Sequence, residues 1–154
     1  MIQLPIKKIE EISSPFENDV WDCGIVSKEM VLHAFKNKLA LDHVQWATLH
    51  LPTTERGLTA TLDGITVQDH AARIAFLMRE GWSDPVEVDV GVPSQNYFPV
   101  WMWTDGNHRI AAAIMLAHET ISAEIAGDLD YAEEIFGITI PDGEEASYEE
   151  VQQA

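Results

Sequence analysis

The chain has 154 residues, 46% of them hydrophobic, with five Trp and five Phe, a composition that favours one packed domain and disfavours disorder throughout. Its 26 acidic and nine basic side chains give a formal net charge of −17. Proteins that bind DNA draw much of their affinity from Lys and Arg, so this charge disfavours direct binding to DNA, whereas it suits a protein partner with a basic surface.

The first 65 residues contain short patterns typical of a strand and of a helix. Ile2, Leu4 and Ile6 alternate with other residues, as in a half-buried strand. Ser27 precedes an apolar pattern and can cap a helix. The resulting predictions are a strand over residues 2–9, an acidic loop over 10–26, a helix from Ser27 to about Asn37, and an insertion with some extended structure over 39–65.

The signals sharpen at Thr66. Thr66 and Asp69 have the spacing of a capping box, apolar residues then recur at helical spacing, and Gly81 suits the position after a helix. Further elements are predicted as strands over residues 86–92, 97–104 and 120–126, helices over 108–118 and from Asp130 to Gly137, and an acidic tail over 141–154. This order predicts a single α/β (α+β) domain over residues 1–140 with one small mixed sheet and packed helices.

The segment Asp105-Gly106-Asn107-His108-Arg109 lies where a predicted strand ends and a helix begins. The first N–H groups of a helix have no partner inside it, and the helix dipole adds partial positive charge there, so an anion is stabilised. Gly106 permits close approach of the backbone, Arg109 offers a fork suited to phosphate, and His108 can exchange a proton near neutral pH. We therefore predict a phosphate site at this turn.

The stretch from Trp103 to Ala113 resembles the signature of the superfamily of ParB N-terminal domains and sulfiredoxins. Members share a strand that ends in a Gly-containing turn, a His-Arg or Arg-Arg pair, and an Ala-rich helix. The helix to Gly81 and the strand after Asp84-Pro85 also match, so the resemblance covers a core of about residues 66–127.

The resemblance implies that Gly106, Asn107, His108 and Arg109 hold the phosphates of a nucleotide, ATP or CTP, together with Mg²⁺. Asp105 is then the candidate Mg²⁺ ligand, and Asp105 and His108 are the candidate catalytic residues of a nucleoside triphosphate hydrolase or phosphotransferase. Sulfiredoxin chemistry does not carry over, because Asn107 stands where that motif has its nucleophilic Cys.

Two alternatives remain open. One is a ParB-like nuclease or another DNA-associated protein of a plasmid or phage, since small ParB-like proteins often occur there. The other is a non-enzymatic module whose acidic surface binds a protein. No helix-turn-helix follows the motif, which disfavours a partition protein. A kinase-like reaction would also need a carboxylate base, which ParB-like kinases draw from the segment after the first strand. Glu17, Asp19 and Asp22 lie in that region, where a solvated acidic loop is the simpler interpretation.

The other residues that could bind a metal or a ligand have simpler interpretations. One cysteine, Cys23, allows no internal disulfide and no CxxC metal pair, and it fits a reducing compartment. No apolar leader and no run near the ~18 residues of a membrane span are present, so we expect a cytoplasmic protein without a membrane partner. Trp101 and Trp103 would share a strand face in the core, with stacking on a base as the alternative. The histidines outside the motif lack a recognised metal spacing: His33, His43, His50, His70 and His118.

Overall fold

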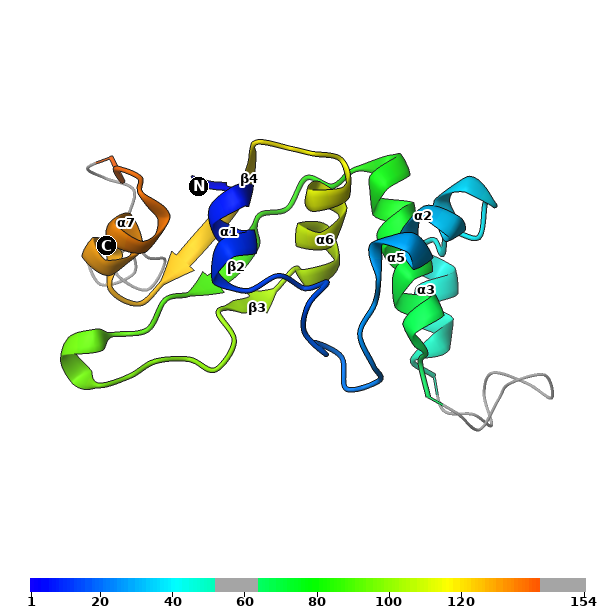
Figure 1. Cartoon of the computed structure of the whole chain (residues 1–154), viewed down its shortest axis with the longest axis horizontal. Helices are drawn as coiled ribbons and strands as arrows, with labels where there is room; N and C mark the ends of the chain where they lie inside the picture. The colour runs from blue at the N-terminus through cyan, green and yellow to red at the C-terminus, as the bar shows by residue number, and fades with distance from the viewer. Residues whose placement is uncertain (52–63, 142–154) are drawn as a thin grey trace. The chain divides into compact units, whose positions relative to one another are not determined.

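The computed structural model describes residues 1–51 and 64–141 (Figure 1). They fall into two compact units, which we call the sheet unit, residues 1–14 and the chain from residue 83 onward, and the helical unit, residues 15–82. Part of the predicted insertion and nearly all of the predicted acidic tail lie outside the described residues. The single domain predicted over residues 1–140 stays a prediction.

The sheet unit contains a four-stranded mixed sheet in the order β1-β4-β2-β3. β4 runs antiparallel to β1 and parallel to β2, while β3 is antiparallel to β2. The strands are β1 (Ile2–Pro5), β2 (Val86–Asp89), β3 (Trp103–Asp105) and β4 (Thr120–Ala126). The predicted α+β class with one small mixed sheet is therefore confirmed, and β4 matches its predicted bounds.

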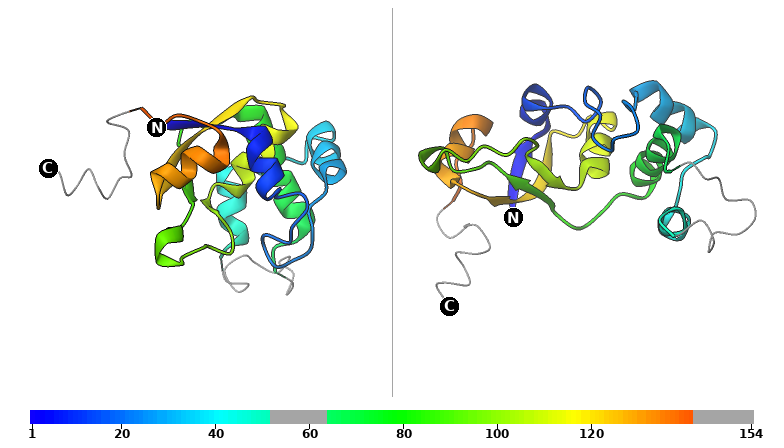
Figure 2. Two further views of the ribbon diagram at one scale, coloured as in Figure 1. Left: turned by 60° about the vertical axis from the view of Figure 1, so that its left-hand side comes forward. Right: turned by 90° about the horizontal axis from the view of Figure 1, so that it is seen from below.

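Three helices cover one face of this sheet: α1 (Ile6–Ile12), α6 (Asn107–Met115) and α7 (Leu129–Phe136). Figures 1 and 2 show α1 between α6 and α7. The strands alternate as a half-buried sheet requires. Leu4, Val88 and Ile121 are buried, whereas Gln3 and Glu124 are exposed on the opposite face.

The helical unit contains α2 (Lys28–Lys36), α3 (His43–Leu49) and α5 (Val67–Glu80). Its α2 and α5 pack closely because Ala34, Ala72 and Ala75 lie at their contact. The predicted capping box is confirmed: Thr66 Oγ1 accepts from Asp69 N at 3.2 Å, and Asp69 Oδ2 accepts from Thr66 N at 2.9 Å. The cap by Ser27 and the helix end at Gly81 are confirmed as well. Across the described ranges, no helix has the length and apolar character needed to cross a membrane.

The predicted strand over residues 2–9 is wrong beyond Pro5. Ile6 and Ile9 belong to α1, where their spacing places both side chains in the core at 2% and 0% exposure. Ile6 N donates to Glu119 O at 2.9 Å, a contact between segments far apart in the chain. The alternation of Ile2, Leu4 and Ile6 therefore continues into a helix. This helix extends to Ile12, so the loop predicted over residues 10–26 is wrong over its first three residues.

Two other predictions need correction. The predicted strand over residues 97–104 starts only at Trp103, and a short 3₁₀ helix, η1 (Pro93–Gln95), occupies part of the preceding turn. The described part of the predicted extended insertion contains α3 instead, capped by Asp42 in a box with Gln45. The helix α7 is capped by Asp128, because its carboxylate accepts from two backbone N–H groups of the first turn, so it starts before Asp130.

Candidate functional site

The predicted phosphate turn joins β3 to α6, as expected from the sequence. Asp105 is the last residue of β3, Gly106 is the N-cap of α6, and Asn107 is its first residue. His108 and Arg109 follow in the first helical turn, and both are half-buried. The five residues thus form a strand-to-helix junction, the location at which backbone N–H groups of a helix become available to a ligand.

Gly106 is required here by the packing of the protein itself. Its φ of +100° is a conformation that residues with a side chain rarely adopt. A Cβ at this position would lie 2.5 Å from Val86 Cγ1 and 3.0 Å from Arg109 Nη2. The turn therefore lies tightly against the start of β2, and only glycine fits.

Arg109 connects the turn to the segment before β2. Its Nη1 donates to the carbonyl oxygens of Asp84 at 2.9 Å and Pro85 at 3.0 Å, and its Nη2 donates to Asp105 Oδ2 at 3.3 Å. These contacts use three of the five N–H groups of the guanidinium, whose side chain is 15% exposed. Arg109 is thus first of all a structural residue of the turn, and among residues 1–51 and 64–141 its Nε and one Nη2 hydrogen have no hydrogen-bond acceptor.

The side chain of Asn107 is also engaged inside the sheet unit. Its Nδ2 donates to Trp103 O at 3.0 Å, and its Oδ1 accepts from Trp101 Nε1 at 2.8 Å. Trp101 therefore lies beside the motif, half-buried and outside any strand, which corrects the shared strand face predicted for the two tryptophans. Trp103 is fully buried, as predicted, and its Nε1 donates to Ser13 O at 2.8 Å.

The amino end of α6 has no side-chain cap among the described residues. Gly106 has no side chain to offer, Asn107 is committed elsewhere, and Asp105 accepts from Arg109. Four other helices, α2, α3, α5 and α7, are capped by a side-chain oxygen, whereas α1 shares the lack of such a cap. The N-cap residue therefore offers α6 no capping side chain, whereas Asp, Asn, Ser and Thr ordinarily supply one.

A divalent cation would find one carboxylate at this turn. The Asp105 side chain is 64% exposed and can add a ligand to a cation that also binds phosphate oxygens, as Mg²⁺ commonly does. Within residues 1–51 and 64–141, no group of three or more His, Cys, Asp or Glu side chains could hold a metal ion. One exposed carboxylate could supply one ligand to a cation, so both the Mg²⁺ site and the nuclease alternative stay predictions.

The other candidate residues lie in the helical unit. Glu17, Asp19 and Asp22 are exposed, and Asp19 Oδ1 accepts from the backbone N–H groups of Cys23 and Gly24, each at 3.0 Å. Asp19 therefore shapes a turn. Desolvation, followed by the carboxylates of Asp19 and Asp22, raises the pKa of the Cys23 thiol and so disfavours a nucleophilic thiolate at neutral pH.

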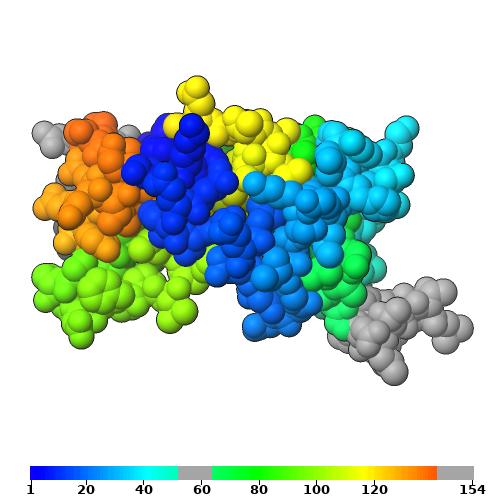
Figure 3. All heavy atoms as spheres, viewed as in Figure 1, coloured from blue at the N-terminus to red at the C-terminus, as the bar shows by residue number. Residues whose placement is uncertain are grey.

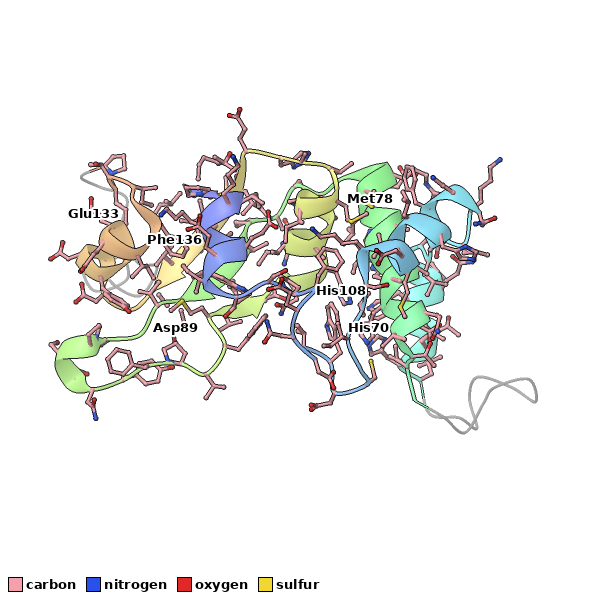
Figure 4. The ribbon with its side chains drawn as sticks, in the orientation of Figure 1. His70, Met78, Asp89, His108, Glu133 and Phe136 are labelled. Carbon is pink, nitrogen blue, oxygen red and sulfur yellow. The ribbon has the colours of Figure 1, made fainter. Side chains whose placement is uncertain are left out.

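Two histidines of the helical unit have clear structural surroundings. His43 Nδ1 lies 2.7 Å from Nη2 of the buried Arg73, which also donates to Leu41 O and so connects α5 to the start of α3. His70, labelled in Figure 4, is 5% exposed. Its ring stacks on that of Trp21. Neither arrangement was visible in the sequence, because the partners are distant along the chain.

Comparison of the chain with protein-family models, with curated proteins and with solved structures finds no match in any of the three.

The hydrogen bonds of Arg109 lead to a stability prediction. Arg109→Met keeps the aliphatic bulk but removes the donors to Asp84 O and Pro85 O, so the free energy of unfolding should fall by about 2 kcal/mol in urea denaturation. The control Asp105→Asn should change it by less than about 0.5 kcal/mol, because the Asp105 side of that ion pair is 64% exposed. Equal urea midpoints for wild type and Arg109→Met would refute the structural role of the guanidinium.

Proposed function

We propose that this protein binds the phosphate group of a nucleotide, such as ATP or CTP, at the amino end of α6. The observation that carries the proposal is the uncapped start of this helix at Gly106, within a nine-residue helix. The backbone N–H groups at the start of a helix and the helix dipole together stabilise an anion at such a place. The resemblance of the surrounding motif to nucleotide-binding domains points to the same ligand class.

The backbone N–H groups of Asn107, His108 and Arg109 would be the main phosphate donors, because they form the first turn of α6. Arg109 would contribute mainly as a positioning residue, since it already binds Asp84, Pro85 and Asp105, and would add at most its spare donors. His108 lies in the same turn and would be the candidate proton donor or acceptor in a hydrolysis or phosphate transfer.

Asp105 makes the proposed binding dependent on a cation. Its exposed carboxylate next to the turn repels a bare phosphate. With Mg²⁺ present, the same carboxylate can share the cation with the phosphate oxygens, and the repulsion becomes a contribution to binding. Trp101, which donates to Asn107 Oδ1, offers a half-buried indole on which the base could stack.

The test is calorimetric titration with ATP, ADP, CTP and GTP, with and without Mg²⁺, and with phosphate release followed in the same samples. We expect at least one nucleotide to bind with a Kd below about 1 mM in the presence of Mg²⁺. Asp105→Asn should tighten binding without Mg²⁺ and weaken it with Mg²⁺. A purely structural Asp105 would leave both affinities unchanged.

A charge placed in the first turn of α6 separates this site from a general charge effect. His108→Glu adds an anion where the phosphate would bind and should weaken binding by about tenfold or more, while it remains compatible with the helix dipole. The control Gln68→Glu adds the same charge to the first turn of α5 and should leave affinity unchanged. If no nucleotide binds, or if His108→Glu binds as tightly as wild type, the proposal is wrong.

A further inference from the structure

Residues 92–102 form an arm that extends from the sheet between β2 and β3 (Figures 1 and 2). It carries three apolar side chains that the sheet unit does not bury: Tyr97 is 47% exposed, Phe98 57% and Val100 fully exposed. We call these three residues the apolar patch. In the space-filling view the arm lies next to α7 and forms part of the surface (Figure 3). Single exposed apolar residues are ordinary, whereas three within four positions on a projecting arm suggest a contact surface.

The arm is held in a defined conformation by its own hydrogen bonds. Val92 and Tyr97 pair as in an antiparallel bridge, with N···O distances of 2.9 and 3.1 Å. The Tyr97 hydroxyl donates to Asp89 Oδ2 at 2.9 Å, and Asp89 Oδ1 accepts from Gly91 N at 2.9 Å, with Asp89 at the base of the arm (Figure 4). The apolar patch therefore lies on an ordered backbone, which lowers the entropy cost of binding.

The base of the arm is also attached to the turn before α7. Gly91 O accepts from Asp128 N at 2.9 Å, and Val90 N donates to Ala126 O at 3.1 Å. This attachment brings the acidic start of α7, with Asp128 as its cap and Asp130 in its first turn, to the base of the arm. The contact surface thus combines the apolar patch with the carboxylates of Asp128 and Asp130.

The charge of this part of the chain defines the partner. Arg109 is the only Lys or Arg from residue 80 to the carboxyl end, and its guanidinium already contacts Asp105. A second copy of the chain, or an anionic lipid surface, would meet the arm with charge of the same sign and be repelled. We propose that the arm docks a protein partner whose surface presents apolar side chains surrounded by Lys or Arg.

The test uses two fluorescent peptides that differ only in their apolar side chains: an amphipathic peptide of Lys and Leu, and a matched peptide with Ser in place of Leu. Fluorescence anisotropy with the full chain should give about tenfold tighter binding of the Lys-Leu peptide, a difference of about 1.4 kcal/mol. Added salt should weaken both peptides and leave most of this ratio, because screening acts on the charges and not on the apolar contact.

The double variant Phe98→Ser and Val100→Ser should abolish the preference for the Lys-Leu peptide without lowering stability, since both side chains are exposed. The control, Leu39→Ser with Val44→Ser, removes two apolar side chains that are 52% and 75% exposed in the helical unit and should keep the preference. Equal preference in the arm variant and in wild type would overturn the proposal. So would a wild-type dimer, seen by light scattering, that the arm variant loses, because the occupant would then be a second copy.

Discussion

Replacing Gly106 with Ala should lower the free energy of unfolding by about 3 kcal/mol or more. Two causes add. The backbone at φ +100° is unfavourable for any residue with a Cβ, and the new methyl group would lie 2.5 Å from Val86 Cγ1 and 2.9 Å from Val86 Cβ. Neither neighbour is the far end of a flexible side chain, so the turn itself would have to move.

Gly137→Ala is the matched control, because this residue also has a positive φ, of +65°, and ends a helix in the same unit. Its added Cβ would meet nothing closer than Lys8 Cε at 3.9 Å, so only the backbone cost of about 1 kcal/mol remains. Urea denaturation followed by tryptophan fluorescence measures both variants. Equal losses for Gly106→Ala and Gly137→Ala would show that contact with Val86 is unimportant.

A double-mutant cycle with Val86→Ala tests the contact directly. Removing the two γ-methyl groups of Val86 costs stability by itself, since this residue is fully buried in β2. It also makes room for a Cβ at position 106, so the combined loss should be smaller than the sum of the two single losses. Additive losses would mean that the cost of Gly106→Ala comes from the backbone alone.

The stability of the helical unit should fall by up to about 3 kcal/mol as the pH is lowered from about 6.5 to about 4, because of His70 alone. This side chain is 5% exposed and stacks on Trp21 with ring centroids 4.4 Å apart and an interplanar angle of 15°. Burial lowers its pKa from 6.5 to about 4, with Asp69 opposing the shift and His50 adding to it.

The sign follows from which state takes up the proton first. Above pH 6.5 His70 is neutral in the folded and the unfolded chain, so its contribution is fully present. Between pH 6.5 and 4 the unfolded chain binds a proton that the folded chain does not, and stability is progressively lost. Below pH 4 both states are protonated, and the loss from this residue becomes constant.

His70→Phe isolates this contribution, because a phenyl ring can keep the stacking on Trp21 and does not titrate in this range. Free energies of unfolding measured from pH 7.5 to 4 should fall less steeply for His70→Phe than for wild type. His118→Phe makes the same substitution at an exposed position of the sheet unit and serves as the comparison. Parallel pH profiles of wild type and His70→Phe would contradict the lowered pKa.

Local signals in the sequence predicted the elements whose contacts are local. The box between Thr66 and Asp69 joins residues three apart, and β4 follows a strict alternation of apolar residues, so both were predicted where they lie. The box between Asp42 and Gln45, which starts α3, has the same spacing and was available to the same reasoning. The irregular spacing of the apolar residues Val44, Trp46 and Leu49 favoured an extended structure instead.

Where the sequence pattern of a segment fits two kinds of secondary structure, tertiary contacts determine which one forms. Ile6 continues the alternation of β1, yet with Ile9 it also fits a helix, and the space between α6 and α7 made the helix the way to bury both. The aromatic residues of the arm have strand propensity, but β2 ends at Asp89, and Tyr97 pairs with Val92 in an isolated bridge instead of a continuous strand. Strand propensity depends on a partner strand.

For the phosphate turn, the sequence by itself determined the position of a glycine-started helix after a strand and the residues that occupy its first turn. Only the tertiary structure decided what those residues do. The guanidinium of Arg109 reaches carbonyls 24 and 25 positions away, and the side chain of Asn107 is held by Trp101 and Trp103. Spacing along a chain predicts local hydrogen bonds, whereas the partners of a long side chain depend on which distant segments the fold brings within its reach.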